Sequence, residues 1–119
     1  MSYEIKLPWP PSVNQWKSPF KGRMILTKKG RDYRKEVHAL MDSYGISNEM
    51  ISDRLRVTLY LTPPTARKFD IDNFCKSPFD ALTTCGFWLD DELIDELRIK
   101  KMPKSKGGSI TLKIESIEQ

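Results

Sequence analysis

The sequence predicts an α/β domain (α+β) in which helices pack on a single mixed β-sheet. Apolar residues alternate with polar ones in the segments 54–61 and 109–117, which is typical of half-buried strands. They recur three or four positions apart in the segments 27–43 and 72–84, which is typical of amphipathic helices. The length of 119 residues favours one domain over residues 1–119. The expected order is strand, helix, strand, helix, strand, strand.

The first half of the chain holds a strand and a helix. Residues 3–7 alternate in an extended pattern, and three prolines between positions 8 and 11 end the strand because proline has no backbone donor. Residues 12–26 are expected to form a loop. Thr27 is the expected N-cap of a helix that runs to about residue 43.

The second half is expected to supply the remaining strands and a second helix. A strand over 54–61 ends at two prolines, and a helix follows over 72–84, with Pro78 expected to kink it. The segments 97–102 and 109–117 are predicted strands, and the glycine-containing turn between them predicts a β-hairpin.

Composition excludes several classes of protein. No apolar run is long enough to span a membrane, and the N-terminus lacks the apolar region of a signal peptide. Two cysteines make no disulfide framework, so we expect a cytoplasmic protein with reduced thiols. No glycine-rich fingerprint or Walker sequence occurs, so no nucleotide cofactor is expected.

The acidic residues are concentrated in one window. Residues 70–96 hold eight of the 16 Asp and Glu residues but only one Lys or Arg, which gives this window a net charge of −7 within a chain of net charge +4. The basic remainder of the chain suggests a polyanionic partner. The acidic window would repel this partner unless a divalent cation neutralised the carboxylates. The alternative is a solvated acidic face on an ordinary basic protein.

Four aspartates in this window are candidate metal ligands. Asp70 and Asp72 follow the second predicted strand, and residues i and i+2 of an extended segment project to the same side. Asp90 and Asp91 follow the second predicted helix, and only one of them is expected to join the first pair. Three carboxylates with open positions suit Mg²⁺. The alternatives are that Asp72 is a helix N-cap and that Asp90 and Asp91 are turn residues.

Lys76 is the only basic residue of the acidic window. In a helix that starts after Asp72 it would lie one turn further along the same face, where it could contact a scissile phosphate and stabilise charge in the transition state. The alternative is a salt bridge to Asp72 or Asp80.

Several motifs together resemble the RusA family of Holliday junction resolvases. They are DIDNFCK at 70–76, FDAL at 79–82, GFWLDD at 86–91, LPWPPSVN at 7–14, and the closing segments KMP at 101–103 and KGG at 106–108. The resemblance covers essentially the whole chain, so the predicted sheet and helices would form a RusA-like fold.

The resemblance implies a homodimeric endonuclease that uses Mg²⁺, with Mn²⁺ as a substitute, to cut four-way junction DNA. Such an enzyme would make paired symmetric nicks in opposed strands during DNA recombination and repair. Asp70, Asp72 and Asp91 match the family's metal-binding catalytic aspartates, and Lys76 matches its catalytic lysine. The family pattern thus favours Asp91, where spacing left Asp90 and Asp91 open. Phe69 departs from the pattern, because a basic residue is expected before the first aspartate.

Basic and polar residues around these motifs are candidates for DNA binding, since phosphate contacts supply affinity without sequence information. They are Arg67, Lys68, Phe69, Asn73, Lys100, Lys101, Lys104 and Lys106. Phe69 would wedge against unstacked bases, or else it is an ordinary packed aromatic. Two other functions remain open: a branched-DNA-binding module without catalysis, and a nuclease that acts on flaps or forks.

Overall fold

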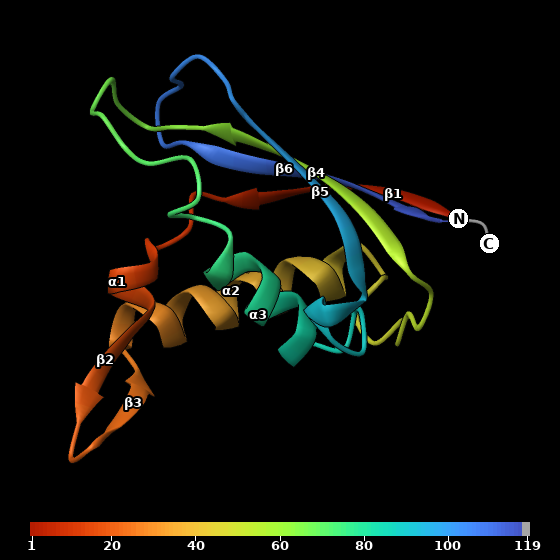
Figure 1. Cartoon of the computed structure of the whole chain (residues 1–119), viewed down its shortest axis with the longest axis horizontal. Helices are drawn as coiled ribbons and strands as arrows, with labels where there is room; N and C mark the ends of the chain where they lie inside the picture. The colour runs from red at the N-terminus through yellow and green to blue at the C-terminus, as the bar shows by residue number, and fades with distance from the viewer. Residues whose placement is uncertain (118–119) are drawn as a thin grey trace.

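The computed structural model describes residues 1–117, and its main sheet has four strands in the order β1-β6-β4-β5 (Figure 1). These strands are β1 (Ser2–Pro8), β4 (Leu55–Thr62), β5 (Ile94–Lys101) and β6 (Ser109–Ser116). β6 pairs antiparallel with both β1 and β4, whereas β4 pairs parallel with β5. The prediction of an α+β fold with a mixed sheet is therefore confirmed.

Two helices, α2 (Lys28–Ser43) and α3 (Lys76–Thr84), cover one face of this sheet (Figure 1). α2 buries Tyr33, Val37 and Met41, whose spacing of four residues places them on one side of the helix. No helix within residues 1–117 has the length and apolar character needed to cross a membrane.

The helix predicted from Thr27 is confirmed. The Thr27 side chain accepts a hydrogen bond from Gly30 N at 2.9 Å, as expected of an N-cap. The strand β4 also follows its predicted alternation, with Val57, Leu59 and Leu61 fully buried against the helices while its intervening residues face away.

The segment after the N-terminal prolines is more ordered than expected. Instead of a loop, it forms the short helix α1 (Val13–Trp16) and a two-stranded sheet of β2 (Lys17–Phe20) and β3 (Arg23–Leu26), which projects from the body (Figure 1). Lys21 and Gly22 both have positive φ, which matches the turn that a two-residue hairpin requires. Strands of four residues are too short for a period of two to be recognised in the sequence.

The prediction that the last two strands form a hairpin is wrong. β5 and β6 do not pair, because β4 lies between them and forms ladders with both. β4 alternates buried apolar residues along its whole length, so it suits the interior of the sheet, whereas β5 has mostly exposed, charged residues that suit an edge.

The second helix also begins later than predicted. Residues 71–74 form a turn, and α3 starts only at Lys76. Pro78 therefore lies in the first helical turn, where a backbone N–H has no intrahelical acceptor, and its missing donor costs nothing. The expected kink is not required.

Candidate functional site

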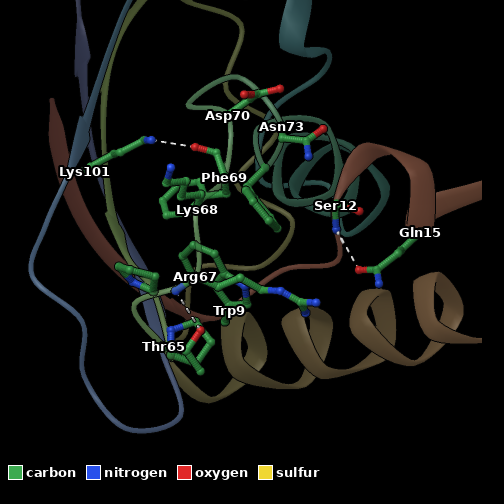
Figure 2. A pocket seen from close by; sticks show the side chains of 13 residues that line it. Trp9, Ser12, Gln15, Thr65, Arg67, Lys68, Phe69, Asp70, Asn73 and Lys101 are labelled. Atoms are coloured by element: carbon green, nitrogen blue, oxygen red, sulfur yellow. Dashed lines mark hydrogen bonds between the residues drawn. The ribbon is translucent and has the colours of Figure 1, made fainter.

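A pocket of about 820 Å³ opens at the carboxyl ends of the parallel strands β4 and β5 (Figure 2). Pro63 and Pro64 follow β4 directly, and Lys101 is the last residue of β5. The opposite wall comes from Ser12 and Gln15 at α1. Ligands of open α/β sheets commonly bind outside the carboxyl ends of parallel strands, so this pocket is a candidate site.

Three aromatic rings from distant parts of the chain meet in this pocket. The ring centroids of Trp9 and Phe74 are 4.7 Å apart, those of Phe69 and Phe74 are 5.4 Å apart, and those of Trp9 and Phe69 are 5.7 Å apart. All three side chains are half-buried, because they pack against the core on one side and line the pocket on the other.

Three basic residues surround the same rings. The Lys101 ammonium lies 4.3 Å from the centre of the Phe69 ring and donates a hydrogen bond to the Phe69 carbonyl oxygen. Arg67 and Lys68 line the pocket and are exposed. Of the other candidates for DNA binding, Asn73 also lines this pocket, Lys104 lines an adjoining hollow, and Lys100 and Lys106 line neither.

Asp70 and Asp72 do not lie in extended backbone as expected. A hydrogen bond of 3.1 Å from Asn73 N to the Asp70 carbonyl closes a turn that contains both aspartates. Asp70 lies at the rim of the pocket (Figure 2).

Asp72 is not the cap of α3, because that position belongs to Cys75, which makes no side-chain capping bond. Burial raises the pKa of the Cys75 thiol to about 11, and the negative charge of Asp72 adds to the rise.

Lys76 lies between two carboxylates. Its Nζ is 3.2 Å from Asp80 Oδ1 and 3.9 Å from Asp91 Oδ2. The hydrogen bond to Asp80 is the main reason why the pKa of Lys76 is raised above its ordinary value. Of the salt bridges considered from the sequence, the structure has the one to Asp80, and it adds the contact with Asp91.

The two adjacent aspartates before β5 have different roles. The Asp90 carboxylate accepts a hydrogen bond of 3.0 Å from Glu92 N, which caps the 3₁₀ helix η1 (Asp91–Leu93) and lowers the pKa of Asp90. Asp91 instead faces Lys76, and burial raises its pKa above the ordinary value, with a contribution from the neighbouring Asp90 carboxyl. Of the two residues for which a turn or capping role was the alternative to metal binding, Asp90 has that role, and Asp91 does not cap Glu92 N.

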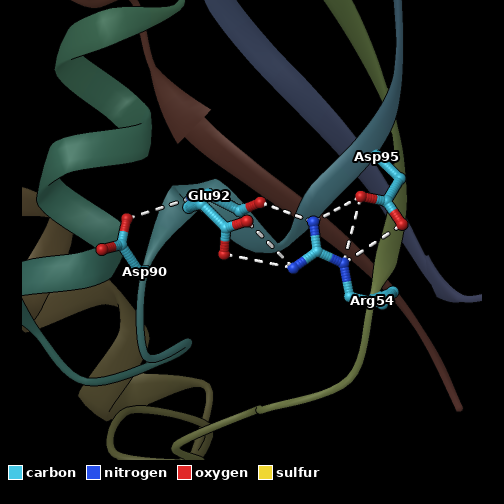
Figure 3. A network of polar contacts seen from close by, with 4 residues as sticks. All are labelled: Arg54, Asp90, Glu92 and Asp95. Atoms are coloured by element: carbon cyan, nitrogen blue, oxygen red, sulfur yellow. Dashed lines mark hydrogen bonds and ion pairs between the residues drawn. The ribbon is translucent and has the colours of Figure 1, made fainter.

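Arg54 fixes the segment that carries Asp91 to the body of the fold (Figure 3). Its guanidinium bonds to both carboxylate oxygens of Glu92 at 3.1 Å, to the Glu92 carbonyl at 2.9 Å, and to the Asp95 carboxylate at 3.0 and 3.1 Å. Because Glu92 and Asp95 lie on either side of the turn into β5, these bonds restrain the position of Asp91.

The three expected metal ligands are not gathered around one point. Within residues 1–117, no group of three His, Cys, Asp or Glu side chains is close enough to hold a metal ion. The donor chemistry nevertheless suits a hard divalent cation, because Asp70, Asp72 and Asp91 are all carboxylates and Asp91 has acidic neighbours that a cation would offset.

Sequence reasoning missed the aromatic part of the site and one hydrogen bond of Asp80. Trp9 and Phe74 are not among the site residues predicted from the sequence, although both line the pocket with Phe69. The salt bridge from Lys76 to Asp80 was one of the alternatives, but the hydrogen bond of 2.9 Å that Asp80 accepts from Trp16 Nε1 was not expected. The four-residue spacing of Lys76 and Asp80 indicated their salt bridge, whereas nothing in the sequence placed Trp9 near residue 69 or Trp16 near Asp80.

The chain matches a family model described as "Endodeoxyribonuclease RusA" over residues 8–115. It is 39% identical over 117 residues to a crossover junction endodeoxyribonuclease RusA from Escherichia coli. The aligned region covers 95% of this chain and 93% of that relative. Relatives with the same description from Shigella sonnei and Enterobacteria phage 82 are 38% and 37% identical, with the same shares of both chains covered. The chain therefore belongs to the RusA family of endodeoxyribonucleases.

Proposed function

We propose that the chain is a divalent-metal-dependent endodeoxyribonuclease that resolves four-way DNA junctions by paired nicks in opposed strands. The observation that carries the proposal is the 3.9 Å contact between Lys76 Nζ and Asp91 Oδ2. It brings the third family aspartate to the start of the helix that directly follows the turn with Asp70 and Asp72. Family membership and the names of the relatives support the same activity.

In this proposal Asp70, Asp72 and Asp91 would hold the metal ion. When bound, Mg²⁺ or Mn²⁺ supplies a water of lowered pKa and neutralises charge on the phosphate. In the structure of residues 1–117, these three carboxylates are not close enough together to hold one metal ion. We therefore expect the turn at 70–73 to rearrange when metal and DNA bind. This turn has exposed residues at 70–72, so it can move without disrupting the core.

Lys76 has the role of stabilising charge at the phosphate. Its side chain is about half exposed, and its ammonium is shared between Asp80 and Asp91. An ammonium held in this way is already oriented before the substrate arrives, and charge that develops on the phosphate oxygens in the transition state strengthens its interaction. Asp80 therefore acts as a positioning residue for Lys76.

A homodimer is the second part of the proposal. A four-way junction needs two nicks in opposed strands, whereas one chain carries one set of these aspartates. A two-fold dimer would present the second set at a matching position. Light scattering of the purified protein at micromolar concentration measures this directly, and a monomer that nicks both strands in one encounter would contradict it.

Cleavage of a synthetic four-way junction tests the activity. Each strand is end-labelled in turn, and paired nicks at symmetric positions are expected with Mg²⁺. Asp70→Asn is expected to abolish cleavage while junction binding survives or tightens, because one repulsive charge is lost. Asp53→Asn is the matched control, since Asp53 precedes β4 at the end opposite the pocket and bonds to Ser116 there.

The outcomes separate the alternatives. Binding without nicks under any divalent ion would identify a branched-DNA-binding module without catalysis. Faster cleavage of flaps or forks than of four-way junctions would assign the nuclease to those substrates. Cleavage by Asp70→Asn at the wild-type rate would refute Asp70 as a metal ligand.

A further inference from the structure

We infer that the pocket lined by Trp9, Phe69 and Phe74 binds a single unstacked nucleobase of the DNA substrate. The inference rests on the proposed function and extends it, because it assigns a base-binding site beside Asp70. Its volume of about 820 Å³ lies within the range of pockets that enclose small organic ligands.

The aromatic rings supply the surface on which a base would stack. Trp9, Phe69 and Phe74 contact one another with centroids 4.7 to 5.7 Å apart, so each ring holds the others in place. In contrast, Trp16, Phe87 and Trp88 are fully buried and have no face left for a ligand. A rigid, half-exposed aromatic cluster is the usual platform for an unpaired base, since every base has a π-face.

The charges around the rings favour an attached phosphate backbone. Arg67, Lys68 and Lys101 line the pocket together with a single acidic residue, Asp70. Within residues 1–117, none of these three basic side chains forms a salt bridge with a carboxylate. Basic groups without carboxylate partners that surround aromatic rings fit a nucleotide, whose base is apolar on its faces and whose phosphate is anionic.

Asn73 provides a polar group that could read the edge of the base. It lines the pocket, and its side-chain amide forms no hydrogen bond within residues 1–117. Its backbone N–H donates to the Asp70 carbonyl, and its carbonyl accepts from Val13 N. An amide can both donate to and accept from a base edge. In contrast, Gln15 already accepts hydrogen bonds from Ser12 N and from Lys29 Nζ.

The position of the pocket relates the bound base to the cleaved strand. Phe69 and Asp70 are adjacent in the chain, and both line the pocket (Figure 2). A nucleotide whose base stacks on Phe69 therefore has its phosphate near Asp70. At a branch point a base is unstacked at lower cost than within a continuous duplex, so the pocket would favour branched over linear DNA.

Photocrosslinking tests the inference on the unmodified protein. Four-way junctions that carry 5-iodouracil at one branch-point position at a time are bound in EDTA, irradiated, and digested for peptide mapping. We expect a crosslink to Trp9, Phe69 or Phe74. Crosslinks confined to Phe20, which is 53% exposed on the projecting hairpin, or no crosslink from any branch-point position, would overturn the inference.

A pair of matched substitutions gives an independent measurement. Phe69→Leu keeps an apolar side chain but removes the ring, and it is expected to weaken junction binding at least about fivefold, the lower end of a stacking contribution. Phe20→Leu makes the same change away from the pocket and is expected to leave the affinity within about twofold. Equal affinities for the two variants, with both melting as the wild type does, would overturn the inference.

Cleavage in Mg²⁺ is measured in parallel so that the two proposals can fail separately. Junction cleavage without a pocket crosslink refutes the base-binding site and leaves the nuclease proposal in place. A pocket crosslink without cleavage under any divalent ion supports the site and refutes the nuclease.

Discussion

Ser77→Ala tests how the N-terminal segment is fixed to the helix that carries Lys76. Ser77 is 1% exposed, and its hydroxyl donates a hydrogen bond of 2.8 Å to the carbonyl oxygen of the buried Pro11. Within residues 1–117, no backbone N–H donates to the same carbonyl. The substitution therefore removes the hydrogen bond and leaves a buried carbonyl without its partner.

The expected loss of stability follows from burial. A buried acceptor left without a partner costs roughly 1–3 kcal/mol, which includes the desolvation that water cannot reverse. We expect the free energy of unfolding to fall by about 2 kcal/mol. For a chain of this size, that corresponds to a decrease in Tm of roughly 6–12 °C. Thermal and urea unfolding, followed by circular dichroism, measure both quantities.

Ser43→Ala is the matched control. Ser43 makes the same kind of bond, from its hydroxyl to the Leu40 carbonyl at 2.7 Å, but at an exposed position near the end of α2. Water replaces this bond, so the free energy of unfolding is expected to change by less than about 0.5 kcal/mol. Equal losses in the two variants would refute the reasoning, because burial would then not decide the cost.

Three further predictions concern the core, the anchoring network and the proposed site. Gly30→Ala is expected to destabilise the fold by about 1–3 kcal/mol in urea unfolding, because a Cβ there would lie 2.6 Å from the Trp16 carbonyl oxygen; an unchanged or higher stability would contradict this. The hydrogen bond from Arg54 lowers the pKa of Asp95, so the folded state binds this proton less readily than the unfolded state does. Its stabilisation is therefore present above pH 3.8 and lost as the pH falls through the lowered pKa, and Asp95→Asn is expected to flatten the acid limb of the melting temperature plotted against pH; an unchanged limb would contradict it. Lys76→Met is expected to reduce junction cleavage about 100-fold or more in single-turnover assays with binding retained, and an equal loss of binding would show that Lys76 acts on affinity instead.

Much of the fold could be predicted because its signals are local. The helix after Thr27 has a capping residue and apolar residues four positions apart, and both act within a few turns of the chain. β4 has an uninterrupted alternation over Leu55–Thr62, which depends only on the pleat of a strand. These elements form where local geometry and burial agree.

Pairing between strands could not be predicted in the same way. The short turn after Lys101 favoured a hairpin, yet β4 occupies the place between β5 and β6. The order of strands depends on which strand buries most apolar surface against α2 and α3, and this is a property of the assembled sheet. The hairpin of β2 and β3 was missed because each strand has only four residues.

In the candidate site, too, the local features could be predicted from the sequence and the contacts between distant segments could not. The acidic window, the single lysine within it and the family motifs can be found in the sequence, because they are runs of residue types at fixed spacing. The sequence could not assign different roles to Asp90 and Asp91. The structure does so by the direction of each side chain, one toward Glu92 N and the other toward Lys76.

By itself, the sequence determined the presence of α2 and α3, the alternation of β4 and the set of charged groups, because each depends on neighbours a few residues apart. Only the tertiary structure decided the order of the strands, the contact of Lys76 with Asp91, and the contacts of Trp9 with Phe69 and Phe74. Those contacts join residues that are at least 15 positions apart in the sequence, and they exist only when the packed core brings the segments together.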